Sequence, residues 1–361
     1  MSDGIPRVEF SAVSPKTLGD SLKSHGVVVI ENVFSAKECD GTMDQIVSCF
    51  ESLGTGIDRK AIRETWTDSN LPPQTRPGMF QSLLGNMQPL WKIRRDERVA
   101  SIFHNAYTSL RTEAKQQYVI SHDGFNVMPN QLVQPDQHWD HPARDWAHLD
   151  QTIRGDPYMC IQGQVVLTNT TAAFRCSPKS HLVYESLLSS EGSPEDDTSN
   201  WRRFNTRDEM KMREARRLIQ TVGGQWQVPV YTPRGSVILW LSSVVHSAKP
   251  SHQVEEASPE DPYRGWRGVA YVCYRPADEF SPEELAAIER SVASNLLMNH
   301  WSTKQFRARG PKRFGVSEGP GAQIQSLLRA PQQLYTSGNP LYEPPEEGAH
   351  IFATKDLTKG A

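Results

Sequence analysis

Residues 233–246 read PRGSVILWLSSVVH, an apolar run between a Pro–Gly turn and a histidine. Pro233 and Gly235 predict the turn, and the unbroken apolar run over 236–245 is typical of a strand buried on both faces. Further strand patterns begin near Tyr118 and recur at 125–129 (FNVMP), 159–169 (MCIQGQVVLTN), 226–232 (WQVPVYT) and 268–274 (GVAYVCY). Because the strands follow one another, the sequence predicts an antiparallel β core and not alternating βαβ units.

Helical patterns flank this core. The first part of the chain predicts a short helix, a buried strand at 26–34 and a second helix with Ser35 as its N-cap. A loop-rich stretch at 55–90 follows. Apolar residues at spacings of three and four then predict an amphipathic helix over 91–118. Helices at 208–219 and from Ser281, which has Glu284 in capping-box spacing, complete an α+β fold.

Composition excludes several classes of protein. The 361 residues contain 37% hydrophobic residues, enough for a substantial core in one elaborated domain or two. A net charge of −3 has no general basic footprint, so nucleic acid and anionic membranes are not expected partners. The local basic cluster at 304–313 is expected to be a solvated surface. Five widely spaced Cys without a CxxC pair, and no long apolar run, predict a cytoplasmic protein with reduced thiols.

Two His-x-Asp patterns occur close together in residues 138–151, HWDHPARDWAHLDQ. One is His138/Asp140 and the other is His148/Asp150. Residues two apart on a strand point to the same face, so either pair could bind one ion. A third ligand from a distant strand would complete a two-His-one-carboxylate site, which leaves open positions on Fe(II). The pattern alone is common by chance, so its context must decide.

The context favours the second pair. A buried strand at 159–169 follows His148/Asp150 after a short loop, whereas His138/Asp140 have loop residues around them and are expected at the mouth of a pocket. His246 follows a core strand and is the expected third ligand, although such a histidine is often structural. Arg267 opens the next strand, where its planar fork could bind a carboxylate bidentately. Arg264 is the alternative, expected as a solvated loop residue.

These residues resemble the phytanoyl-CoA dioxygenase family of Fe(II)/2-oxoglutarate oxygenases, and most closely the branch whose iron motif reads HxDQ. The resemblance runs through most of the chain. Its motifs are GVVVIENVFSAKECD (26–40), TGIDR (55–59), WKIRRDERVASIFHNAY (91–107), SHDGFNVMP (121–129), HLDQ (148–151), IQGQVVLTN (161–169), the SH of 180–181, GSVILWLSSVVH (235–246), RGVAYVCY (267–274) and MNHW (298–301).

The resemblance implies a site and its cofactors. His148, Asp150 and His246 correspond to the iron ligands, and Arg267 corresponds to the arginine that binds the distal carboxylate of 2-oxoglutarate. Gln162 and Gln164 face the same way on the strand after HxD. They are candidates to help hold 2-oxoglutarate, with polar core positions as the alternative. The implied reaction uses Fe(II), 2-oxoglutarate and O2, with ascorbate as a candidate reductant. It hydroxylates an unidentified, small-molecule substrate and releases succinate and CO2.

The resemblance also implies a fold, namely a double-stranded β-helix, the jelly roll of the cupins, in a single domain over 1–361. Residues 1–117 form its mainly helical N-terminal part, 118–280 the core with an insert at about 185–225, and 281–361 a C-terminal helix and tail. The insert, residues 55–90 and the segment around His138 are expected to cover the mouth of the barrel and to select the substrate.

The sequence departs from the family pattern in the turn at 170–181, where His181 is expected to be structural. It also departs at Leu241, which stands where the family has an acidic residue. Two rival interpretations remain open. One is a binding or regulatory protein that keeps the fold without turnover. The other is a zinc hydrolase, because zinc accepts the same ligands; a dicarboxylate clamp has no role in that chemistry.

Overall fold

The computed structural model describes residues 4–81, 84–111, 117–132, 146–249, 251, 253–294, 296–298, 300–301, 319–321 and 345–354. The predicted pair His138/Asp140 and the basic cluster at 304–313 lie outside these residues. No helix in the described part of the chain is both long and apolar enough to cross a bilayer.

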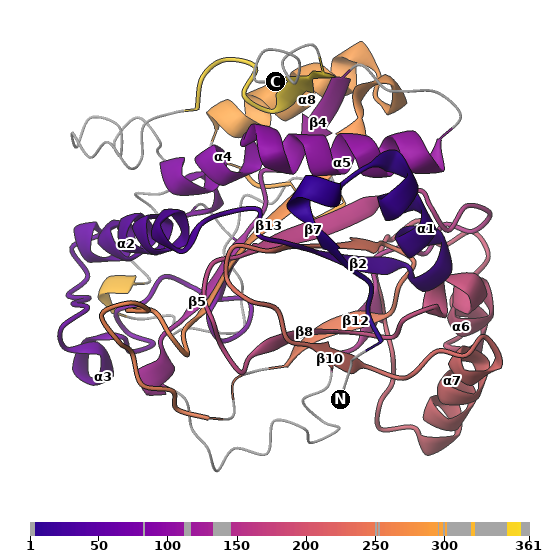
Figure 1. The fold of residues 1–361 in the computed structure, drawn as a ribbon, viewed down its shortest axis with the longest axis horizontal. Coiled ribbons are helices and arrows are strands. Elements are labelled where there is room, and N and C mark those ends of the chain that lie inside the picture. The colour runs from indigo at the N-terminus through magenta and orange to yellow at the C-terminus, as the bar shows by residue number, and fades with distance from the viewer. Residues whose placement is uncertain are drawn as a thin grey trace.

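The described residues form a mixed α and β protein (Figure 1). Its helices are α1 (Pro15–His25), α2 (Ala36–Ser52), α3 (Ile62–Thr65), α4 (Gln88–Arg94), α5 (Glu97–Leu110), α6 (Tyr184–Ser190), α7 (Glu209–Thr221) and α8 (Pro282–Ala293). Its strands are β1 (Arg7–Glu9), β2 (Val27–Glu31), β3 (Met79–Phe80), β4 (Gln117–Ile120), β5 (Phe125–Met128), β6 (His148–Leu149), β7 (Ile161–Val166), β8 (Ala173–Cys176), β9 (Arg202–Arg203), β10 (Val228–Val230), β11 (Val237–Leu241), β12 (His246–Lys249), β13 (Arg267–Pro276) and β14 (Ile351–Ala353).

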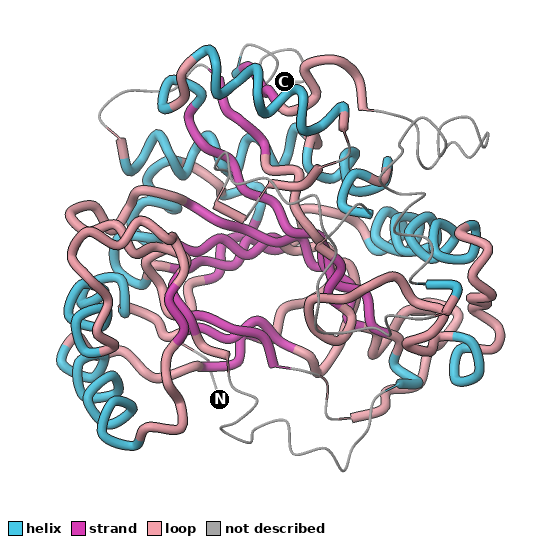
Figure 2. The backbone as a smooth tube through the Cα atoms, turned by 180° about the vertical axis from the view of Figure 1, so that it is seen from behind, coloured by secondary structure: helices cyan, strands magenta, loops and turns pink. Residues whose placement is uncertain are grey.

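The described strands form two sheets. The larger sheet has nine strands in the order β1-β2-β11-β7-β13-β4-β14, with β5 beside β13 and β3 beside β5. All its pairs are antiparallel except β1 with β2, so it is a mixed sheet. The smaller sheet has five strands in the order β10-β8-β12-β6-β9. Figure 2 shows the two groups of strands facing each other, with most of the helices outside them. The finer assignment, a double-stranded β-helix, stays a prediction.

The larger sheet has one helix-covered face and one face toward the smaller sheet. A side chain built on Gly163 would meet Phe103 of α5, and one on Gly268 would meet Met43 of α2. The alternate residues therefore point the other way. Trp240 does so, and its ring lies 4.5 Å from that of Phe174 on the smaller sheet. We call this second side the inner face of the larger sheet.

The N-terminal part contains the buried strand predicted over 26–34. This strand is β2, and it pairs with β11 within the larger sheet. The predicted N-cap at Ser35 and the predicted capping box of Ser281 with Glu284 both form, and Ser35 also makes a capping box with Glu38. The single helix predicted over 91–118 is instead α4 and α5. Asp96 separates them by capping α5 through the backbone N–H of Arg98.

The strand predicted over 236–245 is also too long. β11 ends at Leu241, and a turn carries the chain into β12 of the other sheet, so His246 begins a strand instead of ending one. The two serines of this turn explain the break. The Ser242 hydroxyl donates to the Gln151 side chain, and the Ser243 hydroxyl donates to the carbonyl of Pro157. Side-chain bonds of this kind compete with a strand ladder.

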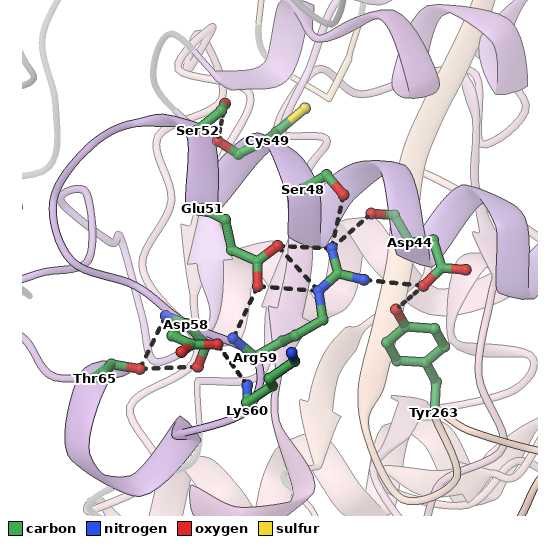
Figure 3. Close-up of polar contacts among 10 residues, drawn as sticks. All are labelled: Asp44, Ser48, Cys49, Glu51, Ser52, Asp58, Arg59, Lys60, Thr65 and Tyr263. Atoms are coloured by element: carbon green, nitrogen blue, oxygen red, sulfur yellow. Dashed lines mark hydrogen bonds and ion pairs between the residues drawn. The ribbon is translucent and has the colours of Figure 1, made fainter.

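Arg59, the last residue of the TGIDR motif, fastens a loop to α2 (Figure 3). Its Nε and Nη2 lie 3.0 and 2.8 Å from the Glu51 carboxylate oxygens, and Nη1 lies 3.1 Å from the Asp44 carboxylate. Nη2 also donates to the Ser48 hydroxyl at 2.7 Å. Tyr263, in the loop before β13, donates to the same Asp44 carboxylate. Arg59 therefore joins its loop to α2, and Asp44 of the same helix also binds the loop before β13.

Arg59→Lys should lower the free energy of unfolding by about 2 kcal/mol, since a lysine cannot bind two carboxylates and a hydroxyl with one planar fork. Chemical denaturation measures the change. Arg217→Lys is the matched control, because Arg217 pairs with Glu214 on the exposed side of α7. It should change stability by less than about 0.5 kcal/mol. Equal stability of the Arg59 variant and the wild type would contradict the structural role.

Candidate metal centre

Three side chains converge between the two sheets. His148 lies on β6, Asp150 follows that strand, and His246 begins β12. One ligand atom from each lies within 4.8 Å of the other two. His148 Nε2 lies 3.5 Å from Asp150 Oδ1, and His246 Nε2 lies 3.4 Å from Asp150 Oδ2. Both histidines are buried, and the three atoms are close enough to bind one metal ion.

Strand pairing and alternation bring these side chains together. β12 pairs with β6 so that His246 stands directly opposite His148, with ring centroids 4.2 Å apart. The neighbouring residues Leu149 and Val245 belong to an apolar cluster with α6 and α7. Because successive side chains on a strand point to opposite faces, this cluster turns the two imidazoles toward the larger sheet.

Both imidazoles are set in the tautomer that a metal needs. His148 Nδ1 lies 2.9 Å from the carbonyl oxygen of Trp146, and His246 Nδ1 lies 3.0 Å from that of Val244. A carbonyl oxygen can only accept, so each Nδ1 carries the hydrogen. The neutral ring then keeps its lone pair on Nε2, the atom that faces Asp150.

Electrostatics favour the same protonation states. Burial lowers the pKa of His148 to about 3, with a further contribution from His246. Burial raises the pKa of Asp150, but the two imidazoles and the hydrogen bond from Gln162 more than offset it, so the net shift is downward. At neutral pH, Asp150 is a carboxylate and His148 is uncharged, so binding of a cation need not displace a proton from either of them.

Gln162 and Gln164 both lie buried on the inner face of the larger sheet. In register, Gln162 stands opposite Trp240, and Gln164 stands opposite Tyr271. The Gln162 side-chain nitrogen donates to Asp150 Oδ2 at 2.9 Å. Its Oε1 is buried without a hydrogen-bond partner among the described residues. Gln162 therefore contacts the candidate metal ligands directly.

Arg267 opens β13 on the same inner face. It is buried, with 7% of its surface exposed, and its Nε has no hydrogen-bond partner in the part of the chain that the structure describes. Burial raises the pKa of Tyr271, and the charge of Arg267 and a hydrogen bond between the two side chains partly offset that shift. Arg264, the alternative, is exposed and lies 3.4 Å from Glu255, as expected of a solvated loop residue.

The sequence did not single out Trp240, an aromatic residue beside the candidate ligands. Trp240 lies with its ring 5.3 Å from that of His246, and its Nε1 is buried without a partner among the described residues. Trp146 stacks on His148 at 4.6 Å, and the Arg76 guanidinium lies over Trp146. Alternation along 236–241 shows which residues share a face with Trp240. Only the register of β11 shows that this face is the inner one.

The predicted insert has two roles in the structure. Its helices α6 and α7 pack behind the strands of the candidate ligands and do not cover the site. Trp201, from the same insert, is half-exposed, and its ring lies 6.0 Å from that of His148. His181 is structural, as predicted, because its Nε2 contacts the backbone carbonyl of Lys23.

No model of a known protein family matches the chain. No curated protein matches its sequence either. Among solved structures, the chain is similar to a protein from Salmonella typhimurium LT2 that is provisionally named an oxidoreductase. The TM-score is 0.51 at 13% identity, over 89% of this chain and 85% of that one. This similarity supports a shared fold and no more.

Two further alignments have lower scores. GIG2 (DUF1479) of Candida albicans, the product of GlcNAc Inducible Gene 2, aligns with a TM-score of 0.49 at 14% identity, over 93% of this chain and 86% of that one. The epimerase SnoN, solved with Fe3+, alpha-ketoglutarate and nogalamycin RO, aligns with a TM-score of 0.42 at 12% identity, over 73% and 84% of the two chains. Neither score carries an argument.

His246→Ala should abolish tight binding of Co(II), a spectroscopic substitute for Fe(II), by removing one of three ligands. We expect a loss larger than the roughly 10–100-fold typical of substitutions around a metal site. Visible absorption during titration measures it. His104→Gln is the control, because His104 contacts the Tyr118 hydroxyl instead of the candidate ligands. Equal Co(II) affinity of the His246 variant and the wild type would show that the three residues do not form the site.

Proposed function

We propose that the protein is a non-haem, Fe(II)- and 2-oxoglutarate-dependent dioxygenase that hydroxylates a C–H bond of a small molecule and releases succinate and CO2. The observation that carries this proposal is the combination of a His148–Asp150–His246 cluster with a buried guanidinium, Arg267, on the sheet face opposite. We further propose that the two sheets form a double-stranded β-helix, and that the protein acts in the cytoplasm without nucleic acid or membrane partners.

The donor set fits ferrous iron. Two neutral imidazole nitrogens and one carboxylate oxygen are the ligands of the facial triad, which leaves positions on the metal for co-substrate and oxygen. His148 and His246 each have Nδ1 held by a backbone carbonyl, which fixes the ring and points Nε2 inward. Zinc accepts the same donors, so the case for an oxygenase depends on the neighbouring polar groups.

Those neighbours fit a dicarboxylate. Arg267 Nε and Trp240 Nε1 are buried donors without partners among the described residues. Buried donors are rarely left unbonded in folded proteins, so a ligand with acceptor oxygens is the expected partner. Arg267 presents its charge in a fork that matches a carboxylate, and the Tyr271 phenol beside it holds that fork. A hydrolase has no use for such a clamp.

Each group has a distinct task in this proposal. Iron, 2-oxoglutarate and O2 together supply the oxidant, with ascorbate as the reductant that keeps the metal ferrous. Arg267 grips the distal carboxylate and so orients the co-substrate. Gln162 holds Asp150 in place through its side-chain amide. Phe174 and Trp240 form an apolar wall beside His246, which excludes water from the reaction. Trp146 and Trp201, whose rings both lie near that of His148, are the proposed contacts for the substrate.

Formation of succinate from 2-oxoglutarate tests the reaction. With Fe(II), ascorbate and O2, the wild type should produce succinate slowly without a substrate and faster with the right member of a substrate panel. His246→Ala should produce none. Absence of both turnover and 2-oxoglutarate binding would overturn the proposal and favour a binding protein. Metal-dependent hydrolysis without oxygen would favour the hydrolase.

Arg267→Lys should weaken 2-oxoglutarate binding by roughly 10–100-fold, because a lysine cannot form the bidentate contact. Anaerobic titration of the Fe(II)-loaded protein measures the affinity without turnover. Arg264→Lys is the matched control and should bind 2-oxoglutarate as the wild type does. If both variants bind alike, Arg267 is not the carboxylate clamp.

A further inference from the structure

A single amide joins the candidate metal ligand Asp150 to a segment near residue 300, late in the chain. The Gln162 side-chain nitrogen donates to Asp150 Oδ2 at 2.9 Å and to the backbone carbonyl of His300 at 3.1 Å. An amide nitrogen has two hydrogens, so these two bonds use both of them. The orientation of the Gln162 amide therefore depends on the position of residue 300 as well as on Asp150.

His300 is itself held in place on several sides. Its Nδ1 lies 2.7 Å from Asp123 Oδ2, close enough for an ion pair but not aligned as a hydrogen bond, and the Asp123 side chain is only 2% exposed. The imidazole packs between two rings of the inner face, those of Trp240 at 5.3 Å and Tyr271 at 5.4 Å. Next to it, the Trp301 side chain packs with Cys160 and Cys273. The Asp123 carboxylate is thus a polar neighbour of the His300 side chain, whereas the other contacts described here are aromatic and apolar.

Asp123 belongs to the turn 121–124 (SHDG), which is fixed from three directions. Its second oxygen accepts from the backbone N–H of Gly124 at 2.6 Å. Arg94 is fully buried, and its guanidinium donates to the carbonyls of Gly85, Asp123 and Tyr271. The backbone N–H of Met298 donates to the carbonyl of His122. The turn is therefore fixed by hydrogen bonds, and it can position the segment around His300.

We propose that the Asp123–His300 contact is a positioning latch. It holds the carbonyl of residue 300 where Gln162 needs it and so sets the orientation of the metal-binding carboxylate of Asp150. The proposal rests on the metal site proposed above. Neither His300 nor Asp123 is a ligand in this scheme. They act through Gln162. The motifs SHDG and MNHW, which are far apart in the sequence, thus both help to orient Asp150.

The Asp150 carboxylate is free to rotate unless a neighbouring group holds it. Asp150 follows β6 and lies outside the strand ladder, so its oxygens can turn about the side-chain bonds unless a neighbour fixes them. Gln162 lies on a six-residue strand within the larger sheet and provides that neighbour. Without the carbonyl of residue 300, the amide would lose one of its two acceptors and could rotate. Outer partners of this kind commonly change metal affinity by roughly 10–100-fold when they are removed.

Co(II) binding by the full-length chain tests the latch. Asp123→Ala and His300→Leu should each weaken Co(II) affinity at least about fivefold and change the visible Co(II) spectrum, because the Asp150 oxygens change position. Gln162→Leu should have the largest effect. Asp123→Asn keeps a polar side chain of the same size beside His300 and should retain more of the affinity than Asp123→Ala. This rescue and the spectral change separate positioning from a general loss of stability.

His350→Gln is the matched control. His350 Nδ1 lies 2.7 Å from Glu289, so the variant removes a similar imidazole–carboxylate contact at α8. Its Co(II) affinity and spectrum should equal those of the wild type. If the Asp123 variant does not fold, the Co(II) affinities and spectra of His300→Leu and Gln162→Leu still test the latch. Wild-type affinity and spectrum in these variants would overturn the latch, whereas failure of the wild type to bind Co(II) would instead overturn the proposed metal site.

Discussion

The pairing of β12 with β6 is the constraint on which the candidate metal centre depends. It places His246 directly opposite His148, and both strands are short. Their side-chain directions are fixed from behind by the apolar cluster under α6 and α7, in which Leu149 and Val245 are buried. An apolar cluster on one face of a strand forces the alternate side chains onto the other. The insert that supplies α6 and α7 therefore supports the ligands, besides bringing Trp201 near them.

The inner face of the larger sheet is unusual for a protein core. It buries Gln162, Gln164 and Arg267 within a sheet whose opposite face is apolar. Burying a polar group costs free energy unless it is hydrogen-bonded, and two of these atoms, Gln162 Oε1 and Arg267 Nε, have no partner among the described residues. A fold that only needed a core would fill these positions with apolar side chains. The buried polar side chains are explained if a polar ligand completes their hydrogen bonds.

Segments that are far apart in the sequence also meet around this site. β2 from the N-terminal part pairs with β11, and the segment around His300 packs on the inner face beside Trp240 and Tyr271. Arg94, on α4, adds a further link, because it donates to backbone carbonyls before β5 and on β13. The geometry of the site therefore depends on several distant segments of the chain and not only on the strands that carry the candidate ligands.

Local sequence patterns determined much of the secondary structure and the list of candidate residues. Ser35 and Ser281 marked helix starts correctly, because capping depends on residues three positions apart. The context of His148 and Asp150, with His246 after a core strand and Arg267 at the start of the next, points to these four residues, as does the family resemblance. The break at Ser242 was missed, because the serines leave the strand ladder only when Gln151 and Pro157 are near them.

Tertiary structure alone decided how those residues meet. The register of β11 and β13 against β7 put Trp240 and Tyr271 on the face of Gln162 and Gln164, and a shift of one residue would have turned them away. The contact of Asp123 with His300 joins residues 177 positions apart, so no local pattern could reveal it. Sequence fixes which side chains are available, whereas distances between remote strands follow only from packing the whole chain.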